Sequence, residues 1–290
     1  MATQQTVSSR SEIDAGQRFA FGENWQRFLA VLDDARIAQA QESFCKMLAL
    51  DNLAGKSFLD IGSGSGLHSL VARRLGARVH SFDFDTESVA CTREVCRRYF
   101  AGDAQWTVTQ GSVLDRAYLA TLGTWDVVYS WGVLHHTGQL WKALDHAAER
   151  VAPGGLLFIS LYNDQGRDSR SWLRVKRLYN ATPAGLRFLV LGPAFAWLWG
   201  PNLVLDLLRG RPFSAWRSYG VQRGMSPMVD VVDWVGGLPF EVSKPEQVFE
   251  FVKARGFSLA RLSTCAGGKG CNEYVFRRDA RIEALPDLAS

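Results

Sequence analysis

The amino-acid sequence predicts an α/β fold: a mostly parallel sheet of seven strands with an antiparallel last strand, and a helical insertion after the fifth strand. Three observations predict it. Short apolar runs alternate with helical patterns over residues 53–165, a glycine-rich turn ends the first apolar run, and one helix followed by two strands closes the chain after residue 243. The content of 47% hydrophobic and 21% charged residues is typical of a folded globular protein.

The N-terminal part, residues 1–52, is expected to form a cap of two helices over 19–32 and 34–50, because apolar residues recur there at helical spacing. The core follows over residues 53–165. Its five strands are expected over residues 56–61, 78–82, 106–109, 125–130 and 156–161. Its helices are expected up to residue 75, over 87–100 and over 138–151. The turn Pro153-Gly154-Gly155 should lead into the fifth strand.

The C-terminal part, residues 243–290, is expected to complete the core. Ser243 and Glu246 have the spacing of a capping box, and Gly256 is a natural helix stop. Two strands over 257–264 and 272–277 follow, joined by a glycine-rich turn. A helix and a strand hairpin that close a parallel sheet are unlike the plain dinucleotide-binding topology.

The insertion, residues 166–242, is rich in arginine and tryptophan. Between Gly166 and Arg223 there are ten basic and two acidic residues, so the segment carries about +8 of a chain whose net charge is +4. Residues 188–205 are uncharged and long enough for a membrane span. Gly192-Pro193 and Gly200-Pro201 should break this run into short pieces, so no spanning helix is expected. The alternatives are a lid over a substrate pocket, peripheral contact of residues 171–217 with a membrane, or an oligomer contact.

Composition excludes other classes. The small net charge does not indicate a nucleic-acid binder. The five cysteines form no CxxC pair, so we expect neither a disulfide framework nor a zinc site. The first sixteen residues are polar and predict no secretory signal. We therefore expect a cytoplasmic protein, with peripheral contact at the inner membrane face as the alternative that the insertion leaves open; the oligomeric state also stays open.

A glycine-rich loop follows the first strand, and its residues are the first candidates for ligand binding: Asp60, Gly62, Ser63, Gly64 and Gly66. Glycine lets the backbone turn tightly and lets a ligand approach it, and the next helix presents free N–H groups. The spacing is GxGxG rather than GxGxxG. A carboxylate at Asp60 would repel a pyrophosphate but could face an amino group. The loop therefore favours S-adenosylmethionine (SAM) over NAD.

Two further loops contribute candidates. Asp83 ends the second strand about twenty residues later, where a carboxylate can accept both ribose hydroxyl hydrogens, and Phe84 could lie against an adenine face. The alternative role for Asp83 is that of a helix cap, and Asp85 is better placed for that role. Ser112 and Val113 follow the third strand, where a side-chain oxygen and a backbone N–H can read the adenine edge.

These motifs, together with the fourth-strand run from Asp126 to His136, resemble those of class I SAM-dependent methyltransferases, which have a Rossmann-like fold. The likeness covers residues 53–161, resumes near 243, and is nearest to ubiquinone-biosynthesis O-methyltransferases; residues 162–242 have no counterpart. The resemblance implies that the glycine loop contacts the methionyl part of SAM and that Asp83 holds the ribose. It also implies that Ser130 and Trp131 line the sulfonium end.

The same resemblance implies that the transferred methyl group points towards His135 and His136. Methyl transfer needs an aligned acceptor and a base of near-neutral pKa, so one histidine is the candidate general base, His136 ahead of His135. Tyr162 leaves the fifth strand at the same edge and could orient the acceptor. The alternative for the histidines is a purely structural role. Too few oxygen ligands converge there for a metal, so none is expected.

The expected reaction is methylation of a small molecule that is lipophilic or acidic, most readily on a phenol- or quinol-like oxygen. Sulfur or nitrogen methylation, a SAM-binding protein without turnover, and an NAD-dependent oxidoreductase are the alternatives. Nucleic acid is not an expected substrate, because no Asp/Asn-Pro-Pro-aromatic motif follows the fourth strand.

Overall fold

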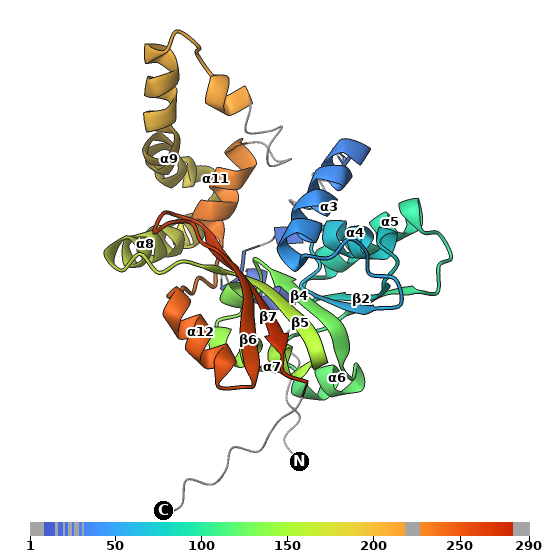
Figure 1. The fold of residues 1–290 in the computed structure, drawn as a ribbon. Helices are drawn as coiled ribbons and strands as arrows, with labels where there is room; N and C mark the ends of the chain where they lie inside the picture. Colours follow the sequence, from blue (N-terminus) through green and yellow to red (C-terminus); the bar gives the residue numbers. More distant parts are fainter. Residues whose placement is uncertain are drawn as a thin grey trace, which may run out of the picture.

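The computed structural model describes residues 9–14, 17–19, 21–22, 25, 29–30, 32–217 and 227–280. Its strands are β1 (Ser57–Ile61), β2 (Arg78–Asp83), β3 (Trp106–Gln110), β4 (Trp125–Trp131), β5 (Val151–Tyr162), β6 (Phe257–Ser263) and β7 (Cys271–Arg278). They form one sheet of order β3-β2-β1-β4-β5-β7-β6 (Figure 1). Strands β1 to β5 are parallel, and β7 is antiparallel to β5 and β6. The predicted fold is confirmed.

Helices cover both faces of the sheet (Figure 1). One layer consists of α3 (Asp34–Leu48), α4 (Leu67–Arg74) and α5 (Thr86–Tyr99). The other consists of α6 (Arg116–Thr121), α7 (Leu140–Glu149) and α12 (Pro245–Lys253). Successive strand residues alternate between the two layers: Phe58 packs under α3 and α4, whereas Leu59 packs under α6 and α7. The site loops are therefore mounted on a core that is closed on both sides.

The predicted helix over 34–50 is confirmed as α3, which ends at Leu48 because Ala49 adopts a left-handed conformation. Much of the predicted helix over 19–32, including Phe28, lies outside the described residues. The described N-terminal elements are α1 (Ser9–Asp14) and short pieces near Phe21 and Trp25. Asp85 caps α5 by accepting a hydrogen bond from the N–H of Glu87 (3.1 Å), as its position predicted.

Two boundary predictions in the core are wrong. The turn Pro153-Gly154-Gly155 lies inside β5 rather than before it: Trp125 pairs with Val151 and Val127 pairs with Leu156, so the extra residues form a bulge. The capping box of Ser243 and Glu246 does not form. Ser243 is buried in a bridge with Asn163. Helix α12 starts at Pro245, one residue later than the predicted capping box would place it. There, the side chain of Gln247 accepts from the N–H of Lys244 (3.0 Å).

The insertion forms a helical unit of α8 (Arg167–Ala181), the short 3-10 helix η2 (Ala184–Leu186), α9 (Phe188–Leu208) and α11 (Pro227–Gly236). Helices α8, α9 and α11 share a small apolar cluster that includes Trp172, Tyr179 and Trp199. Figure 1 shows α9 at the end of the unit that lies away from the sheet.

The prediction that prolines break the uncharged run is wrong. Pro193 and Pro201 lie inside α9, which continues for 21 residues. By length and composition α9 could cross a membrane, and only 11% of its most apolar window is buried. This exposure explains why the helix tolerates both prolines, because carbonyl groups that lose an N–H partner there can bond to water.

Candidate functional site

The candidate site lies at the carboxyl edge of the sheet, between the ends of β1 and β4. The strand order reverses there, because β1 is followed in space by β2 on one side and by β4 on the other. In open α/β sheets this crevice is where ligands bind. The loops after β1, β2, β4 and β5 therefore converge on one place.

The loop after β1 turns sharply at Gly62 and Gly64, whose φ angles are +77° and +52°. The N–H groups of Gly62 and Ser63 donate to the carbonyl of Phe82 (2.8 and 3.1 Å). A Cβ at Gly62 would lie 2.4 Å from the Val133 side chain, and one at Gly64 would lie 3.0 Å from the Trp25 ring. Both glycines are therefore required by backbone conformation and by packing.

The end of the loop is fixed to α5. Ser63 and Thr92 share a hydroxyl hydrogen bond (2.9 Å), and Thr92 donates to the carbonyl of Gly64 (3.2 Å). Gly66 stands at the N-terminus of α4 with φ +78°, and a Cβ there would meet Thr92 at 3.0–3.3 Å. The close approach of α5 therefore holds the loop in place.

Asp83 lies directly under this loop. Its Oδ2 accepts from the N–H of Gly64 (3.0 Å) and its Oδ1 from the N–H of Asp85 (2.9 Å). Each oxygen retains a lone pair for a further donor. Burial raises the pKa of Asp83 to about 6, even though these two hydrogen bonds and the charge of Arg18 act in the opposite direction.

Asp60 is a second buried carboxylate beside the first. Its Oδ2 accepts from the hydroxyl of Ser69 (2.5 Å), which also contacts the hydroxyl of Ser81 (2.6 Å). Burial raises the pKa of Asp60 to about 7, and repulsion from Asp83 adds to this increase while the bond to Ser69 opposes it. Within the part of the chain that the structure describes, neither carboxylate forms an ion pair. The floor of the site is thus acidic, with hydrogen bonds and the distant charge of Arg18 as its compensation.

The loops after β2 and β3 have more local contacts. The guanidinium of Arg18 lies 4.9 Å above the ring of Phe84, so one ring face is covered by protein. The hydroxyl of Ser112 accepts from the N–H of Leu114 (3.2 Å). The side chain of Val113 is buried in the core, and its carbonyl accepts from Nδ1 of His146 (2.8 Å). Only the backbone N–H of Val113 is a candidate for ligand contact.

At the end of β4 the two candidates diverge. Ser130 is buried and donates its hydroxyl hydrogen to the carbonyl of Ile61 (3.0 Å), which joins β4 to the start of the glycine loop. Trp131 is 45% exposed, and its Nε1 donates to Glu273 of β7 (2.7 Å). The structure thus brings Ser130 to the loop and directs the indole of Trp131 towards the hairpin.

The two histidines occupy η1 (Leu134–His136), directly after β4, and both are buried. The ring centre of Tyr162 lies 3.9 Å from the ring centre of His135 and 5.4 Å from that of His136. The structure therefore brings together all three residues that the sequence singled out for catalysis.

Hydrogen bonds assign different tautomers to the two rings. Nδ1 of His136 lies 2.6 Å from the carbonyl of Pro239, so Nδ1 must donate and Nε2 keeps its lone pair. Nδ1 of His135 accepts from the N–H of Tyr162 (3.3 Å), so in the neutral ring Nε2 carries the hydrogen. Burial lowers the pKa of His136 to about 3 and that of His135 well below its usual range, so both are neutral at pH 7.

Arg18 connects the two ends of the site and was not predicted. Its Nη1 donates to the carbonyl of His136 (3.1 Å), its guanidinium covers Phe84, and its Nε pairs with Glu12 (2.6 Å). Phe21 packs 4.9 Å from the ring of His136. No motif in the polar N-terminal sequence indicated this role, because it depends on how the chain folds back over the sheet.

Lys176 of α8 was also missed. It is fully buried and donates to the carbonyl of Trp234, but no motif distinguishes it from the other basic residues of its segment. The only available signal was its spacing from Trp172 and Tyr179, which places all three on one helix face. Trp234 and Phe240, interpreted from the sequence as core or pocket wall, pack against Tyr162 at 5.3 Å each.

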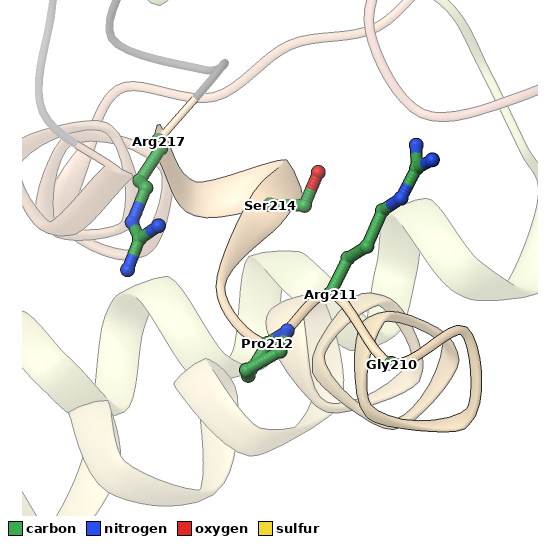
Figure 2. Close-up of a pocket in the computed structure, with 5 residues that line it drawn as sticks. All are labelled: Gly210, Arg211, Pro212, Ser214 and Arg217. Atoms are coloured by element: carbon green, nitrogen blue, oxygen red, sulfur yellow. The ribbon is translucent and has the colours of Figure 1, made fainter.

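A surface hollow of about 630 Å³ lies on the insertion, lined by Gly210, Arg211, Pro212, Ser214 and Arg217 (Figure 2). It follows the end of α9 and contains none of the residues discussed above. Two arginines give it a positive lining, and it lies apart from the residues predicted to bind the cofactor. Over the described residues, no group of three or more His, Cys, Asp or Glu side chains is arranged to hold a metal ion.

Comparison with known proteins gives a family. The family model of a methyltransferase domain matches residues 34–199, more than half of the chain, and confirms the resemblance found in the sequence. The chain is 28% identical over 171 residues to a ubiquinone biosynthesis O-methyltransferase of Sinorhizobium fredii, covering 56% of this chain and 66% of that protein. It is 30% identical over 174 residues to the Brucella anthropi protein of that name, with the same shares.

The chain thus spans just under two thirds of the length of these relatives. A solved structure supports the fold: magnesium protoporphyrin IX methyltransferase from Synechocystis, determined with bound SAM, has a TM-score of 0.54 and 14% sequence identity. The superposition covers 96% of this chain and all of that one.

Proposed function

This chain belongs to the methyltransferase domain family, and from this premise we propose that it is an enzyme that transfers the methyl group of SAM to a small-molecule acceptor. The proposal extends to the acceptor atom, an oxygen, and to the base that removes its proton, His136. The observation that supports it best is the pair of buried carboxylates, Asp60 and Asp83, beneath a glycine loop.

The cofactor fits this acidic floor because of its charge. SAM carries a positively charged sulfonium and an ammonium group, which attract two buried carboxyl groups and favour their ionised form. The pyrophosphate of NAD would instead be repelled by them. SAM, when bound, supplies a methyl group on a good leaving group, so the protein mainly has to align the acceptor and take up a proton.

In this arrangement Asp83 accepts the ribose hydroxyl hydrogens with the lone pairs that Gly64 and Asp85 leave unused. The glycine loop contacts the methionyl part of SAM through Gly62, Ser63, Gly64 and Gly66. Ser130 holds the end of β4 against this loop. Phe84 offers one ring face to the adenine, since Arg18 covers the other. Ser112 and the N–H of Val113 read the adenine edge, and the backbone of Trp131 lies near the sulfonium.

His136 suits the role of base because its Nε2 is an unprotonated acceptor. Burial lowers its pKa in the free protein to about 3, so the role requires that the bound acceptor raise this pKa towards neutrality. A hydroxyl of the acceptor that is hydrogen-bonded to Nε2 would pass its proton to this nitrogen. His135 is the weaker candidate, since its Nδ1 already accepts from Tyr162 and its Nε2 carries the hydrogen. Tyr162 packs against both rings and orients the acceptor by contact. An oxygen acceptor agrees with the name of the relatives, O-methyltransferase.

The decisive experiment measures S-adenosylhomocysteine (SAH) release with matched phenols, thiophenols and anilines. We expect release with phenols or quinols and little with the sulfur and nitrogen analogues. Release only with thiols or amines would contradict an oxygen acceptor. SAH binding without release from any acceptor would favour a SAM-binding protein without turnover.

We also propose a cytoplasmic location with peripheral membrane contact through the insertion. Seven large apolar side chains of α9 are between 46% and 78% exposed: Phe188, Leu189, Trp197, Val204, Leu205, Leu207 and Leu208. The arginine-lined hollow directly after the helix (Figure 2) could take an anionic headgroup. An apolar helix beside arginines is the pattern of an interfacial segment, and it would bring a lipophilic acceptor to the site.

A further inference from the structure

The most unusual charge in the structure is the ammonium of Lys176. The side chain is fully buried, and Nζ donates to the carbonyl of Trp234. Nζ also lies 4.9 Å from the ring centre of Trp234 and 4.6 Å from that of Phe240. Asp233 also attracts it. Removing an ammonium from water is nevertheless costly to the free protein.

Two aromatic side chains, Trp234 and Phe240, lie between Lys176 and Tyr162 of the proposed catalytic centre. Trp234 and Phe240, the two rings beside its ammonium, both pack on Tyr162, and Tyr162 packs on His135 and His136. The insertion thus places a positive charge on the acceptor side of the histidines, away from the acidic floor under the glycine loop.

One hydrogen-bond donor in the same cluster has no partner among the described residues. Nε1 of Trp234 is buried, and an indole nitrogen can only donate. Nε2 of His135 carries the hydrogen in the tautomer set by Tyr162, and a hydrogen bond to the backbone of Ser160 favours protonation of this ring. The cluster therefore combines an unused indole donor with an ammonium, and its open acceptor, Nε2 of His136, is assigned to the hydroxyl of the methyl acceptor.

Native proteins rarely leave buried donors unsatisfied. The carbonyl oxygen of a neutral ligand could accept from the indole N–H but would not compensate the ammonium. An anionic carboxylate would do both. Arg18, whose charge acts on His136 from the other side, adds to the positive field.

We propose that the methyl acceptor carries a carboxylate that binds Lys176 and the indole N–H of Trp234. This inference rests on the proposed function, because it assigns a substrate class to the same site. Lys176 is here a specificity residue: it holds the end of the acceptor remote from the hydroxyl that is methylated. Burial lowers the pKa of Lys176 to about 7 in the free protein, so a bound anion would also favour the charged lysine.

The test uses two probes of the same shape, 3,4-dihydroxybenzoate and 3,4-dihydroxybenzamide, titrated by calorimetry into SAH-saturated protein. We expect the carboxylate to bind the wild-type protein at least tenfold more tightly than the amide. Lys176→Met should abolish this preference while leaving amide affinity within about twofold, and Lys176→Arg should retain part of it. Lys269→Met is the matched control, because Lys269 also lies over tryptophan rings but is exposed.

Equal affinities of the two probes for the wild type, no carboxylate binding at millimolar concentration, or an unchanged preference in Lys176→Met would each overturn the inference. SAH affinity of Lys176→Met, measured in the same instrument, verifies that the variant is folded. If wild-type protein does not bind SAH, the proposed function itself fails. If it binds SAH but does not discriminate between the probes, only the anionic acceptor is refuted.

Discussion

Nδ1 of His136 donates a 2.6 Å hydrogen bond to the carbonyl of Pro239, and this bond decides which ring nitrogen can take a proton. Pro239 belongs to the segment that returns from the insertion to the core. The insertion therefore sets the tautomer of a residue on η1, and the adjacent N–H of Glu241 donates to the carbonyl of His135 (3.0 Å). The proposed role of His136 as base rests on this connection.

Replacing His136 by Gln should lower the turnover number by about 10²- to 10⁴-fold, the usual contribution of a positioned base. SAH affinity should stay within about twofold, because the imidazole does not contact the glycine loop in the structure. His80→Gln provides the control, since His80 bonds to Thr107 on the far strands. Steady-state SAH release and calorimetry measure the two quantities. Full turnover in His136→Gln would eliminate it as the base.

The affinity for SAH should depend on pH through Asp83. Its pKa in the free protein is raised to about 6 by burial, whereas the ribose hydroxyls bind the ionised carboxylate. Affinity should therefore be greatest above pH 7 and should fall below pH 6, approaching tenfold per pH unit as binding requires loss of a proton. Calorimetry between pH 5 and 8 measures it. In Asp83→Asn the dependence should flatten; an identical curve in both proteins would contradict the ribose assignment.

Glu241→Ala should lower the free energy of unfolding by about 1–2 kcal/mol, the usual cost of a lost helix cap. Both carboxylate oxygens of Glu241 accept from the N–H of Leu140 (3.1 and 3.0 Å), at the first turn of α7. Urea denaturation followed by circular dichroism measures the loss. Exposed Glu42→Ala on α3 is the control. Equal stability of the two variants would show that this contact does not hold the insertion return to the core.

Vesicle flotation tests the membrane contact. We expect the protein to float with vesicles containing anionic phosphatidylglycerol and to remain mostly unbound with phosphatidylcholine alone. Trp197→Ser with Leu207→Ser should weaken binding to the anionic vesicles several-fold, and so should Arg211→Glu with Arg217→Glu. Leu262→Ser, an exposed leucine on β6, should have no effect. Wild-type protein that does not float, or that forms dimers which the α9 substitutions dissociate, would favour an oligomer contact instead.

The sequence predicted the parts of the fold that depend on local pattern. Strands β1 and β4 could be predicted from short apolar runs, because both faces of a parallel strand are buried. The glycine loop could be predicted because glycine is the residue that best fits its left-handed positions. Helix α6, with six residues, is too short to show a periodicity. The continuity of α9 could not be predicted, because whether a helix tolerates proline depends on its exposure.

The residues of the candidate site likewise fall into two groups: those located by local sequence pattern and those placed by tertiary packing. Asp60, Asp83 and the histidine pair could be predicted because each lies in, ends or follows a strand that the apolar pattern locates. Arg18 and Lys176 reach the site from segments whose position is set by tertiary packing, and no spacing rule links them to the strands. Trp131 was placed correctly on β4, but its indole is drawn to Glu273, a partner 142 residues away.

A calorimetric titration of the wild-type protein with SAH and, separately, with NAD tests whether the loop after β1 forms a SAM site. We expect one SAH site per chain, no measurable NAD binding, and at least tenfold weaker SAH binding in Asp83→Ala, because hydrogen bonds to a charged group contribute roughly 1.5–3 kcal/mol. The control variant Asp51→Ala, at an exposed position before β1, should bind SAH like the wild type. Binding of NAD in place of SAH, or unchanged SAH affinity in Asp83→Ala, would contradict this SAM site.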